Sequence, residues 1–168
     1  VDVGRKRTNF DNQAKELGRF LDMYWCFGSA STSSGGHYGN AVLSKEPLEF
    51  VQNLPLNENM TAEPRAALWV RTRFVHSELN VLNTHFGLLW SDADKQGKLL
   101  LQQSSELKCN LTCKTILCGD FNLFSIESFC RDCSYIFEDV QKRFKGQRMR
   151  TFTSKLPVLD LDHILISK

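Results

Sequence analysis

The sequence predicts a mixed α/β fold, because short apolar strands intermix with segments of helical periodicity. Two adjacent strands are expected over residues 66–75 and 79–83, and a strand–helix–strand step continues through residues 91–108 and 115–118. The 168 residues favour a single domain over residues 1–168. Hydrophobic residues make up 42% and charged residues 24%, which is typical of a globular chain and excludes a disordered one.

The N-terminal half is expected to contain one helix and one short strand. Residues 11–24 form the predicted helix, which Asp11 or Asn12 can cap. Its apolar face is expected to consist of positions at helical spacing, namely Ala14, Leu17, Phe20 and Leu21. The Ser- and Gly-rich residues 28–39 predict a loop, residues 40–44 a strand, and residues 53–63 another loop.

The C-terminal half alternates more regularly between strand and helix. A turn at residues 76–78 separates the two adjacent strands, and acidic residues at the start of 91–108 suit the first turn of a helix. Residues 126–133 also have a helical pattern, and residues 162–167 predict the last strand.

Polar residues follow several of these strands, where α/β proteins usually place their sites. Asp120 and Asn122 end the strand that begins at Thr115, and in an extended chain they share one face. A neighbouring carboxylate and amide can orient a water molecule, although Asp-x-Asn can also simply close a strand. His85 follows residues 79–83, and Asp162 opens the last strand. Each could take part in a site or could have an ordinary structural role.

Taken in order, the segments GNAVLS, NTHFG, CGDFN and LDHILIS resemble the endonuclease/exonuclease/phosphatase superfamily. Its members include deoxyribonuclease I-like nucleases, abasic-site endonucleases, inositol polyphosphate 5-phosphatases and neutral sphingomyelinases. Residues 1–8 and 63–70 fit its bacterial members, and the resemblance covers nearly the whole chain. It implies a four-layer α/β sandwich of two mixed β-sheets flanked by helices.

The resemblance also implies a metal-dependent phosphoesterase that directs water at phosphorus. Asp120 would orient or deprotonate the water, Asn122 would hold it, and His85 would donate a hydrogen bond to a phosphoryl oxygen. Asp162 would support the catalytic histidine of the family, and Asn40 would line the pocket as a substrate-binding residue. Mg²⁺, with Mn²⁺ as an alternative, would act as a Lewis acid on the phosphate.

Several motifs of the family are absent from these 168 residues. They are the Asn of its first strand, a metal-binding Glu expected just before Val1, and a closing Ser-Asp-His-x-Pro motif; His163 does not replace that final histidine, because it belongs to the preceding motif. The chain is therefore expected to be an interior fragment, incomplete at both ends, with little or no activity on its own.

Two other classes of function remain open at this stage. One is a non-catalytic interaction module on the same scaffold. The other is a zinc-bound structural domain, because Cys109 and Cys113 are followed by Cys130 and Cys133 at a spacing near that of zinc ribbons.

The partner is expected to be a phosphate ester, either a nucleic acid or a phosphorylated lipid or small molecule. The net charge of +2 does not decide between them, but five basic residues between positions 142 and 150 could neutralise phosphates of a nucleic acid: Lys142, Arg143, Lys145, Arg148 and Arg150. No apolar run is long enough to predict a transmembrane segment, and no signal-peptide pattern opens the chain. We therefore favour a cytoplasmic monomer.

Overall fold

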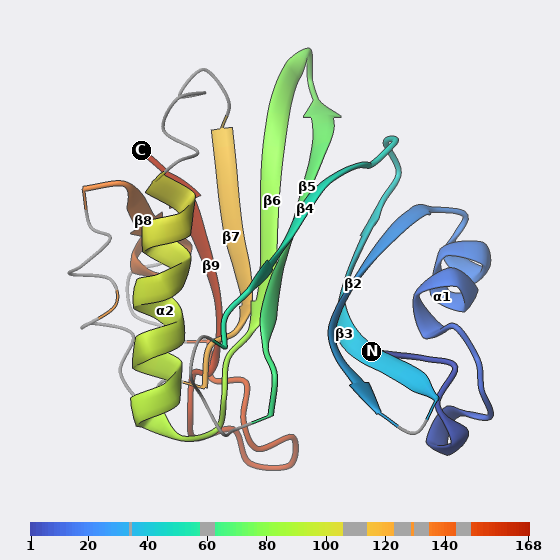
Figure 1. Cartoon of the computed structure of the whole chain (residues 1–168). Coiled ribbons are helices and arrows are strands. Elements are labelled where there is room, and N and C mark those ends of the chain that lie inside the picture. The colour runs from blue at the N-terminus through green and yellow to red at the C-terminus, as the bar shows by residue number, and fades with distance from the viewer. Residues whose placement is uncertain (34, 58–62, 106–113, 123–128, 130–134, 144–148) are drawn as a thin grey trace.

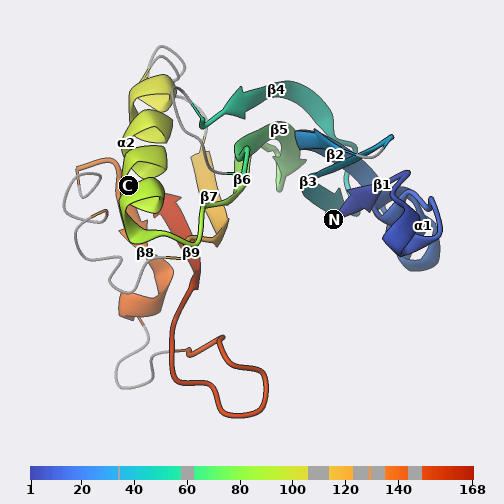
Figure 2. The same ribbon diagram turned by 60° about the horizontal axis from the view of Figure 1, so that its bottom comes forward.

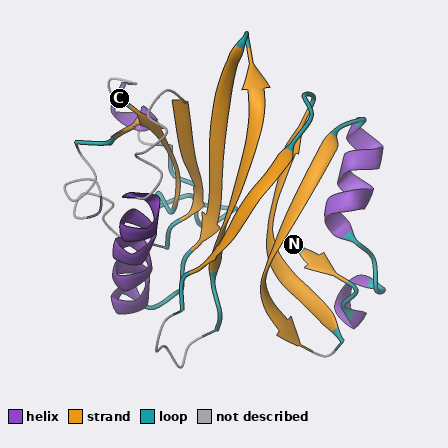
Figure 3. Cartoon of the chain, turned by 45° about the horizontal axis from the view of Figure 1, so that its top comes forward, coloured by secondary structure: helices purple, strands orange, loops and turns teal. Residues whose placement is uncertain are grey.

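A computed structural model gives the structure of the protein, and it shows two β-sheets packed against each other with a helix on each outer side (Figures 1 and 3). The residues that the structure describes are 1–33, 35–57, 63–105, 114–122, 129, 135–143 and 149–168. The resulting order of layers, helix, sheet, sheet and helix, confirms the four-layer α/β sandwich.

The smaller sheet is antiparallel throughout and comes from the N-terminal part of the chain. Its strands are β1 (Asp2–Val3), β2 (Tyr24–Ser33) and β3 (Gly36–Ser44), in the order β1-β3-β2. A short 3-10 helix at Lys6–Thr8 and helix α1 (Gln13–Leu21) connect β1 to β2. The side chain of Asn12 accepts a hydrogen bond from the backbone N–H of Lys15, which identifies Asn12 as the N-cap of α1.

The larger sheet has six strands and is mixed. It comprises β4 (Glu49–Pro55), β5 (Ala66–Phe74), β6 (Ser77–His85), β7 (Lys114–Asp120), β8 (Phe137–Asp139) and β9 (Asp162–Ser167). Their order is β4-β5-β6-β7-β9-β8, and Figure 2 shows β4 to β9 fanned side by side. Only β6 and β7 run parallel among these pairs, since helix α2 (Trp90–Ser105) carries the chain back between them.

The main apolar core lies between α2 and the larger sheet. Ala93 and Leu100 of the helix are buried, as are Leu82, Leu117 and Leu165, which come from β6, β7 and β9. Phe86, Phe121 and Phe129 complete this core with edge-to-face ring contacts of 5.1–6.2 Å between centroids. The core therefore fixes β6, β7 and β9. The predicted catalytic residues lie at the ends of these strands: His85 ends β6, Asp120 ends β7 and Asp162 begins β9.

Polar side chains connect the two sheets. Asn40 on β3 donates from Nδ2 to the carbonyl oxygen of Ala66 at 2.7 Å, and Asn53 on β4 donates to the carbonyl oxygen of Ser29 at 2.6 Å. Each bond crosses from one sheet to the other, so the faces of the two sheets are held in a specific register.

Three expectations for local structure were wrong. Residues 28–39 do not form a loop, because most of them belong to the long hairpin of β2 and β3, and β4 extends into the loop predicted from residue 53. Helix α1 packs through Ala14 and Gly18 and leaves Phe20 86% exposed. Gly18 allows this approach, since a Cβ there would lie 2.7 Å from the Trp25 ring. The predicted helix at 126–133 lies outside the described residues except for Phe129, which is helical and buried.

Candidate active site

Three of the predicted site residues lie in one row across the larger sheet. His85 at the end of β6 pairs in register with Asp120 at the end of β7, and Asp120 pairs with Asp162 at the start of β9. Side chains at directly paired positions point to the same face of a sheet. The parallel pairing of β6 and β7 and the antiparallel pairing of β9 thus bring residues from positions 85, 120 and 162 together.

The imidazole of His85 contacts residues from three different elements. Its Nδ1 lies 3.0 Å from the hydroxyl oxygen of Tyr38 on β3 and 3.2 Å from Nη1 of Arg65, which immediately precedes β5. Its Nε2 faces Oδ2 of Asp120 at 3.7 Å, a separation too long for a direct hydrogen bond. The ring is therefore held from the Nδ1 side and is open to another hydrogen-bond acceptor on the Nε2 side.

Electrostatics around His85 favour the neutral imidazole. Burial and then the nearby Arg65 guanidinium lower the pKa of His85 below its ordinary value of 6.5, while Asp120 opposes this shift. At neutral pH the pair of His85 and Asp120 is accordingly a neutral ring beside a carboxyl group rather than an ion pair.

Asp120 occupies a half-buried position in the middle of the row. Burial raises the pKa of this carboxyl above its ordinary value of 3.8, and the backbone N–H of Asn122, which donates to Oδ1 at 3.0 Å, opposes the increase. Asp162 raises the pKa of Asp120 further, since the two carboxylates repel each other. A carboxylate with a raised pKa is a stronger base, which is the property needed to accept a proton from water.

The turn after β7 places Asn122 beside the row. Phe121 is fully buried and anchors this turn in the apolar core, while Asn122 takes a left-handed conformation with φ of 48°. The Asn122 side chain donates from Nδ2 to the carbonyl oxygen of Phe86 at 2.9 Å. That bond uses one of its two amide hydrogens and leaves its Oδ1 as an acceptor.

Asn40 and Asp162 lie at different depths. Asn40 is buried between the sheets, where its bond to Ala66 also brings it near Thr84, whose hydroxyl donates to the same carbonyl at 3.4 Å. Asp162 is exposed at the far end of the row, where it lines a pocket of about 390 Å³ together with residues that include Cys118, Val140, Met149 and Ile164.

His163 faces away from the row. It is only 3% exposed, its Nε2 donates to the carbonyl oxygen of Asp160 at 2.9 Å, and its ring packs edge-on against Phe121. Its Nδ1 lies 3.6 Å from Oδ2 of the buried Asp139. This histidine therefore supports the sheet from the core side and does not reach the row.

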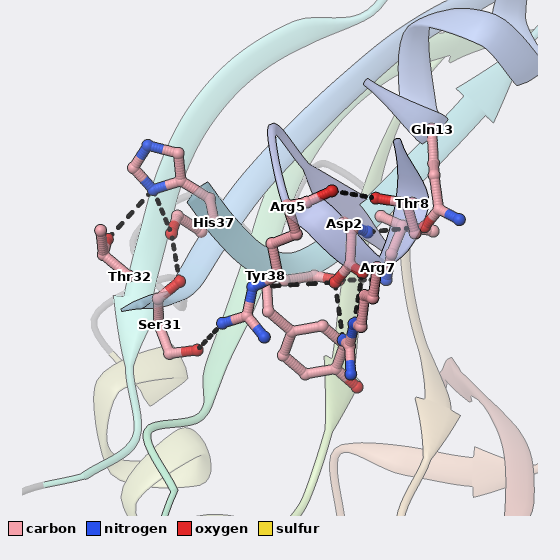
Figure 4. A network of polar contacts seen from close by, with 12 residues as sticks. Asp2, Arg5, Arg7, Thr8, Gln13, Ser31, Thr32, His37 and Tyr38 are labelled. Atoms are coloured by element: carbon pink, nitrogen blue, oxygen red, sulfur yellow. Dashed lines mark hydrogen bonds and ion pairs between the residues drawn. The ribbon is translucent and has the colours of Figure 1, made fainter. Parts of the chain in front are cut away.

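Three arginines, none of them among the predicted site residues, surround Tyr38. The guanidinium carbons of Arg5 and Arg7 each lie 5.6 Å from the centroid of the Tyr38 ring, and that of Arg65 lies at 6.0 Å. Figure 4 shows Arg5 and Arg7 beside this ring, with Arg7 bonded through two nitrogens to the buried Asp2. The sequence signals for this cluster were the resemblance of residues 1–8 and 63–70 to bacterial family members and the glycines that flank His37 and Tyr38.

The described residues do not form a complete metal site. Within the described ranges, no group of three or more His, Cys, Asp and Glu side chains could hold an ion. The hard oxygen donors that the chain does bring together are the carboxylates of Asp120 and Asp162, which are too few by themselves.

Other predicted features lie largely outside the described ranges. Cys109, Cys113, Cys130 and Cys133, the candidate zinc ligands, are all among the residues that the structure does not describe. Lys145 and Arg148 of the basic segment are also outside. Arg143, which is described, pairs with Glu138 at 2.7 Å, so part of the positive charge of that segment is offset locally. None of the described helices is long and apolar enough to cross a membrane.

The chain is similar to known proteins in sequence and in fold. The uncharacterized protein YbhP of Escherichia coli strain K12 is 27% identical over 151 residues, which cover 86% of this chain and 58% of that protein. The chain thus spans less than two thirds of the length of this curated relative.

Among solved structures, the mannosyl-6-phosphatase Bt3783 of Bacteroides thetaiotaomicron superposes with a TM-score of 0.70 at 18% identity, covering 92% of this chain and 67% of that one. The human Nocturnin catalytic domain with bound sulfate superposes with a TM-score of 0.66 at 20% identity, covering 95% and 65% of the two chains. At these identities the likeness concerns the fold. The family described as Endonuclease/Exonuclease/phosphatase matches residues 5–168, and the row of His85, Asp120 and Asp162 lies within that match. This chain belongs to the Endonuclease/Exonuclease/phosphatase family.

Proposed function

We propose that the protein is a phosphoesterase that hydrolyses a phosphodiester or phosphomonoester by attack of an activated water on phosphorus. The observation that carries this proposal is the row of His85, Asp120 and Asp162 on one face of the larger sheet. A histidine donor and a carboxylate base beside one another supply the two functions that such a hydrolysis needs, one for the phosphoryl oxygen and one for the water.

Asp120 and Asn122 act on the attacking water. The raised pKa of Asp120 makes its carboxylate a better proton acceptor, and Oδ1 of Asn122 is free to accept a hydrogen bond from the same water. The backbone N–H of Asn122 also donates to Oδ1 of Asp120, so the two residues are held next to each other and can orient the same water molecule.

His85 acts on the phosphoryl group. Negative charge grows on the non-bridging oxygens during the attack, and a fixed N–H donor stabilises that charge more in the transition state than in the substrate. Removing one such donor typically lowers kcat about 10²–10³-fold. Asn40 and Asp162 complete the proposed site, Asn40 by shaping the pocket wall and Asp162 by supporting the catalytic histidine that the family implies.

The proposed activity requires a divalent cation, Mg²⁺ or alternatively Mn²⁺, as the family resemblance implies. The described residues do not hold such an ion by themselves. We expect removal of divalent cations by a chelator to abolish turnover and added Mg²⁺ to restore it.

A hydrolysis assay on the longest natural form of the protein tests the proposal. The substrates are bis(4-nitrophenyl) phosphate, a diester, and 4-nitrophenyl phosphate, a monoester, each with Mg²⁺ or Mn²⁺. We expect turnover of at least one ester, reduced about 10²-fold or more by His85→Asn and by Asp120→Asn. Asp94→Asn is the matched control, because Asp94 is a carboxylate on α2 that pairs only with the solvent-facing Lys98 in the described contacts. Equal turnover by all three variants would contradict the roles of His85 and Asp120, and no turnover of any phosphate ester would instead favour a non-catalytic interaction module.

The class of substrate is tested by the salt dependence of binding. If a nucleic acid is the substrate, the binding constant for DNA falls steeply with salt, and the slope decreases when Lys142 and Arg150 are replaced by Ala. Arg143 is less suitable for this test, since its pair with Glu138 already offsets its charge. A salt-independent interaction would favour a small phosphorylated substrate.

A further inference from the structure

The Nδ1 atom of His85 lies between two hydrogen-bond donors. One is the Arg65 guanidinium, whose Nη1 is 3.2 Å away, and the other is the Tyr38 hydroxyl at 3.0 Å. A guanidinium can only donate hydrogen bonds and does not lose its proton in proteins. The contact with Arg65 therefore requires an unprotonated Nδ1, whatever the hydroxyl of Tyr38 does.

Arg65 is held firmly in this position. It is 6% exposed, its Nη2 pairs with Glu63 at 3.0 Å, and its backbone N–H donates to the side chain of Asn57 at 2.6 Å. Its guanidinium also lies 6.0 Å from the centroid of the Tyr38 ring, so Arg65 and Tyr38 contact each other as well as His85. A buried arginine with this many contacts has little freedom to turn away from the imidazole.

The remaining charged groups that face His85 act in opposite directions. Arg65 and the amino group of Val1 disfavour a protonated imidazole, whereas Asp120 and Glu63 favour one. Burial adds to the effect of Arg65, and the net result is that the pKa of His85 falls below its ordinary value. The charges thus agree with the hydrogen-bond geometry, which independently requires that Nδ1 carries no proton.

We propose that Arg65, together with Tyr38, is a positioning residue that fixes His85 as the neutral tautomer with its single hydrogen on Nε2. A neutral imidazole carries one N–H, so an acceptor role at Nδ1 directs that hydrogen to Nε2, the atom that faces Asp120. Its use in catalysis rests on the proposed function: His85 then acts as a preset hydrogen-bond donor to the phosphoryl group and not as the base that takes the proton from water.

This assignment separates the roles of the two strand ends. The base is Asp120 on β7, and the donor is His85 on β6, whose tautomer is set by residues from β3 and from the segment before β5. Tyr38 belongs to the smaller sheet, so the packing of the two sheets contributes directly to the state of the imidazole. A change that separates the sheets should remove the Tyr38 contact and leave Arg65 as the donor that holds Nδ1 unprotonated.

Nitrogen NMR of the histidine side chains tests the tautomer without requiring activity. The chain has four histidines, and the His85 signals are assigned by their loss in His85→Asn. We expect the wild-type protein at pH 7 to show an unprotonated Nδ1 and a protonated Nε2 at His85. A protonated Nδ1, or a doubly protonated ring at pH 7, would overturn the proposal, including when the protein is an active phosphoesterase.

Substitutions then assign the effect to its cause. Tyr38→Phe should keep the same tautomer, because Arg65 still donates to Nδ1. The double variant Tyr38→Phe with Arg65→Met should give a mixture of both tautomers and a higher titration midpoint for His85. Tyr38→Phe with Arg65→Lys, which keeps a donor at position 65, should shift both back towards the wild type. Arg71→Met is the matched control, because Arg71 lies on β5, the strand that Arg65 immediately precedes, and pairs with Glu49 instead. An unchanged His85 spectrum in the double variant would refute a positioning role for Arg65.

Kinetics separate this proposal from the proposed function. If the protein is a phosphoesterase and the tautomer assignment holds, Arg65→Met should lower kcat about tenfold, the effect of one lost hydrogen bond, with a smaller change in KM, and should shift the pH profile in the same direction as the His85 titration. If the NMR tautomer is as expected but no ester is turned over, the proposed function fails while the assignment of Arg65 stands.

Discussion

Replacing Gly119 by Ala should disturb the site more than any other single methyl group. Gly119 lies on β7 directly beside Thr84 of β6, one position before Asp120, and has φ of +143°, a conformation that side chains rarely adopt. An added Cβ would collide with the carbonyl oxygen of Thr84 and lie 2.9 Å from its carbonyl carbon, which is closer than real Cβ atoms approach. The obstacle is backbone of a central strand, so it cannot turn aside.

The expected loss follows from two terms of similar size. Backbone strain costs about 1–3 kcal/mol and overpacking another 1–3 kcal/mol, so Gly119→Ala should lower the free energy of unfolding by about 2–6 kcal/mol. For a chain of this length the thermal midpoint should fall by about 5–20 °C. Separation of β6 from β7 also moves His85 away from Asp120, and a displacement near 1 Å should lower kcat/KM about 10²-fold.

Thermal unfolding followed by circular dichroism measures the first effect, and ester hydrolysis measures the second. Gly87→Ala is the matched control, since a Cβ there would lie at an ordinary 3.4 Å from the Cβ of Asp92 and should change stability by less than about 0.5 kcal/mol. A thermal midpoint of Gly119→Ala within about 2 °C of the wild type, with unchanged activity, would refute the close contact of β6 and β7 at the site.

Three further predictions concern the charge and packing of neighbouring residues. Burial raises the pKa of Asp120, so the folded protein binds the proton of this carboxyl group more tightly than the unfolded chain does. The ionised carboxylate therefore lowers the stability of the fold as the pH rises through the folded pKa. Asp120→Asn should abolish turnover while keeping or raising the thermal midpoint at pH 7. Phe121→Ala should cost about 3–5 kcal/mol in denaturant unfolding because Phe121 is fully buried, and a loss below 1 kcal/mol would contradict its place in the core. The hydrogen bonds from Arg7 lower the pKa of Asp2, so the stabilising effect of the Asp2 carboxylate is present above pH 3.8 and is lost as the pH falls through the folded pKa. Asp2→Asn should be less stable than the wild type at pH 7 and should approach the stability of the wild type in acid. A difference in stability that is constant with pH would argue against this ion pair.

Much of the fold could be predicted from local patterns, because apolar and β-branched residues gather in the strands of the larger sheet. Ser77–His85 alternates in burial, Ala66–Phe74 is buried over its first three residues, and the helix between β6 and β7 implies their parallel pairing. The hairpin of β2 and β3 could not be predicted in the same way. Its strands carry Ser, Gly and Thr over residues 28–37, a composition that local propensity assigns to a loop, and pairing across the hairpin outweighs that propensity.

The candidate site could be predicted only in part for a related reason. Position at a strand end and a match to a motif are enough to predict four of the site residues, namely His85, Asp120, Asn122 and Asp162. Arg65 and Tyr38 reach His85 from a different segment and a different sheet, over 20 and 47 positions of sequence. Contacts of this kind depend on how the two sheets pack, which spacing along the chain does not encode.

A structure with orthovanadate or inorganic phosphate bound would show where the phosphoryl group lies. The anion is expected to bind at the row of the larger sheet, with one oxygen within hydrogen-bond distance of Nε2 of His85, about 2.6–3.2 Å, and with Asp120 and Asn122 on the side from which water attacks. An anion bound instead among Arg5, Arg7 and Tyr38, or on the basic segment near Arg150, with no contact to His85, would contradict this expectation.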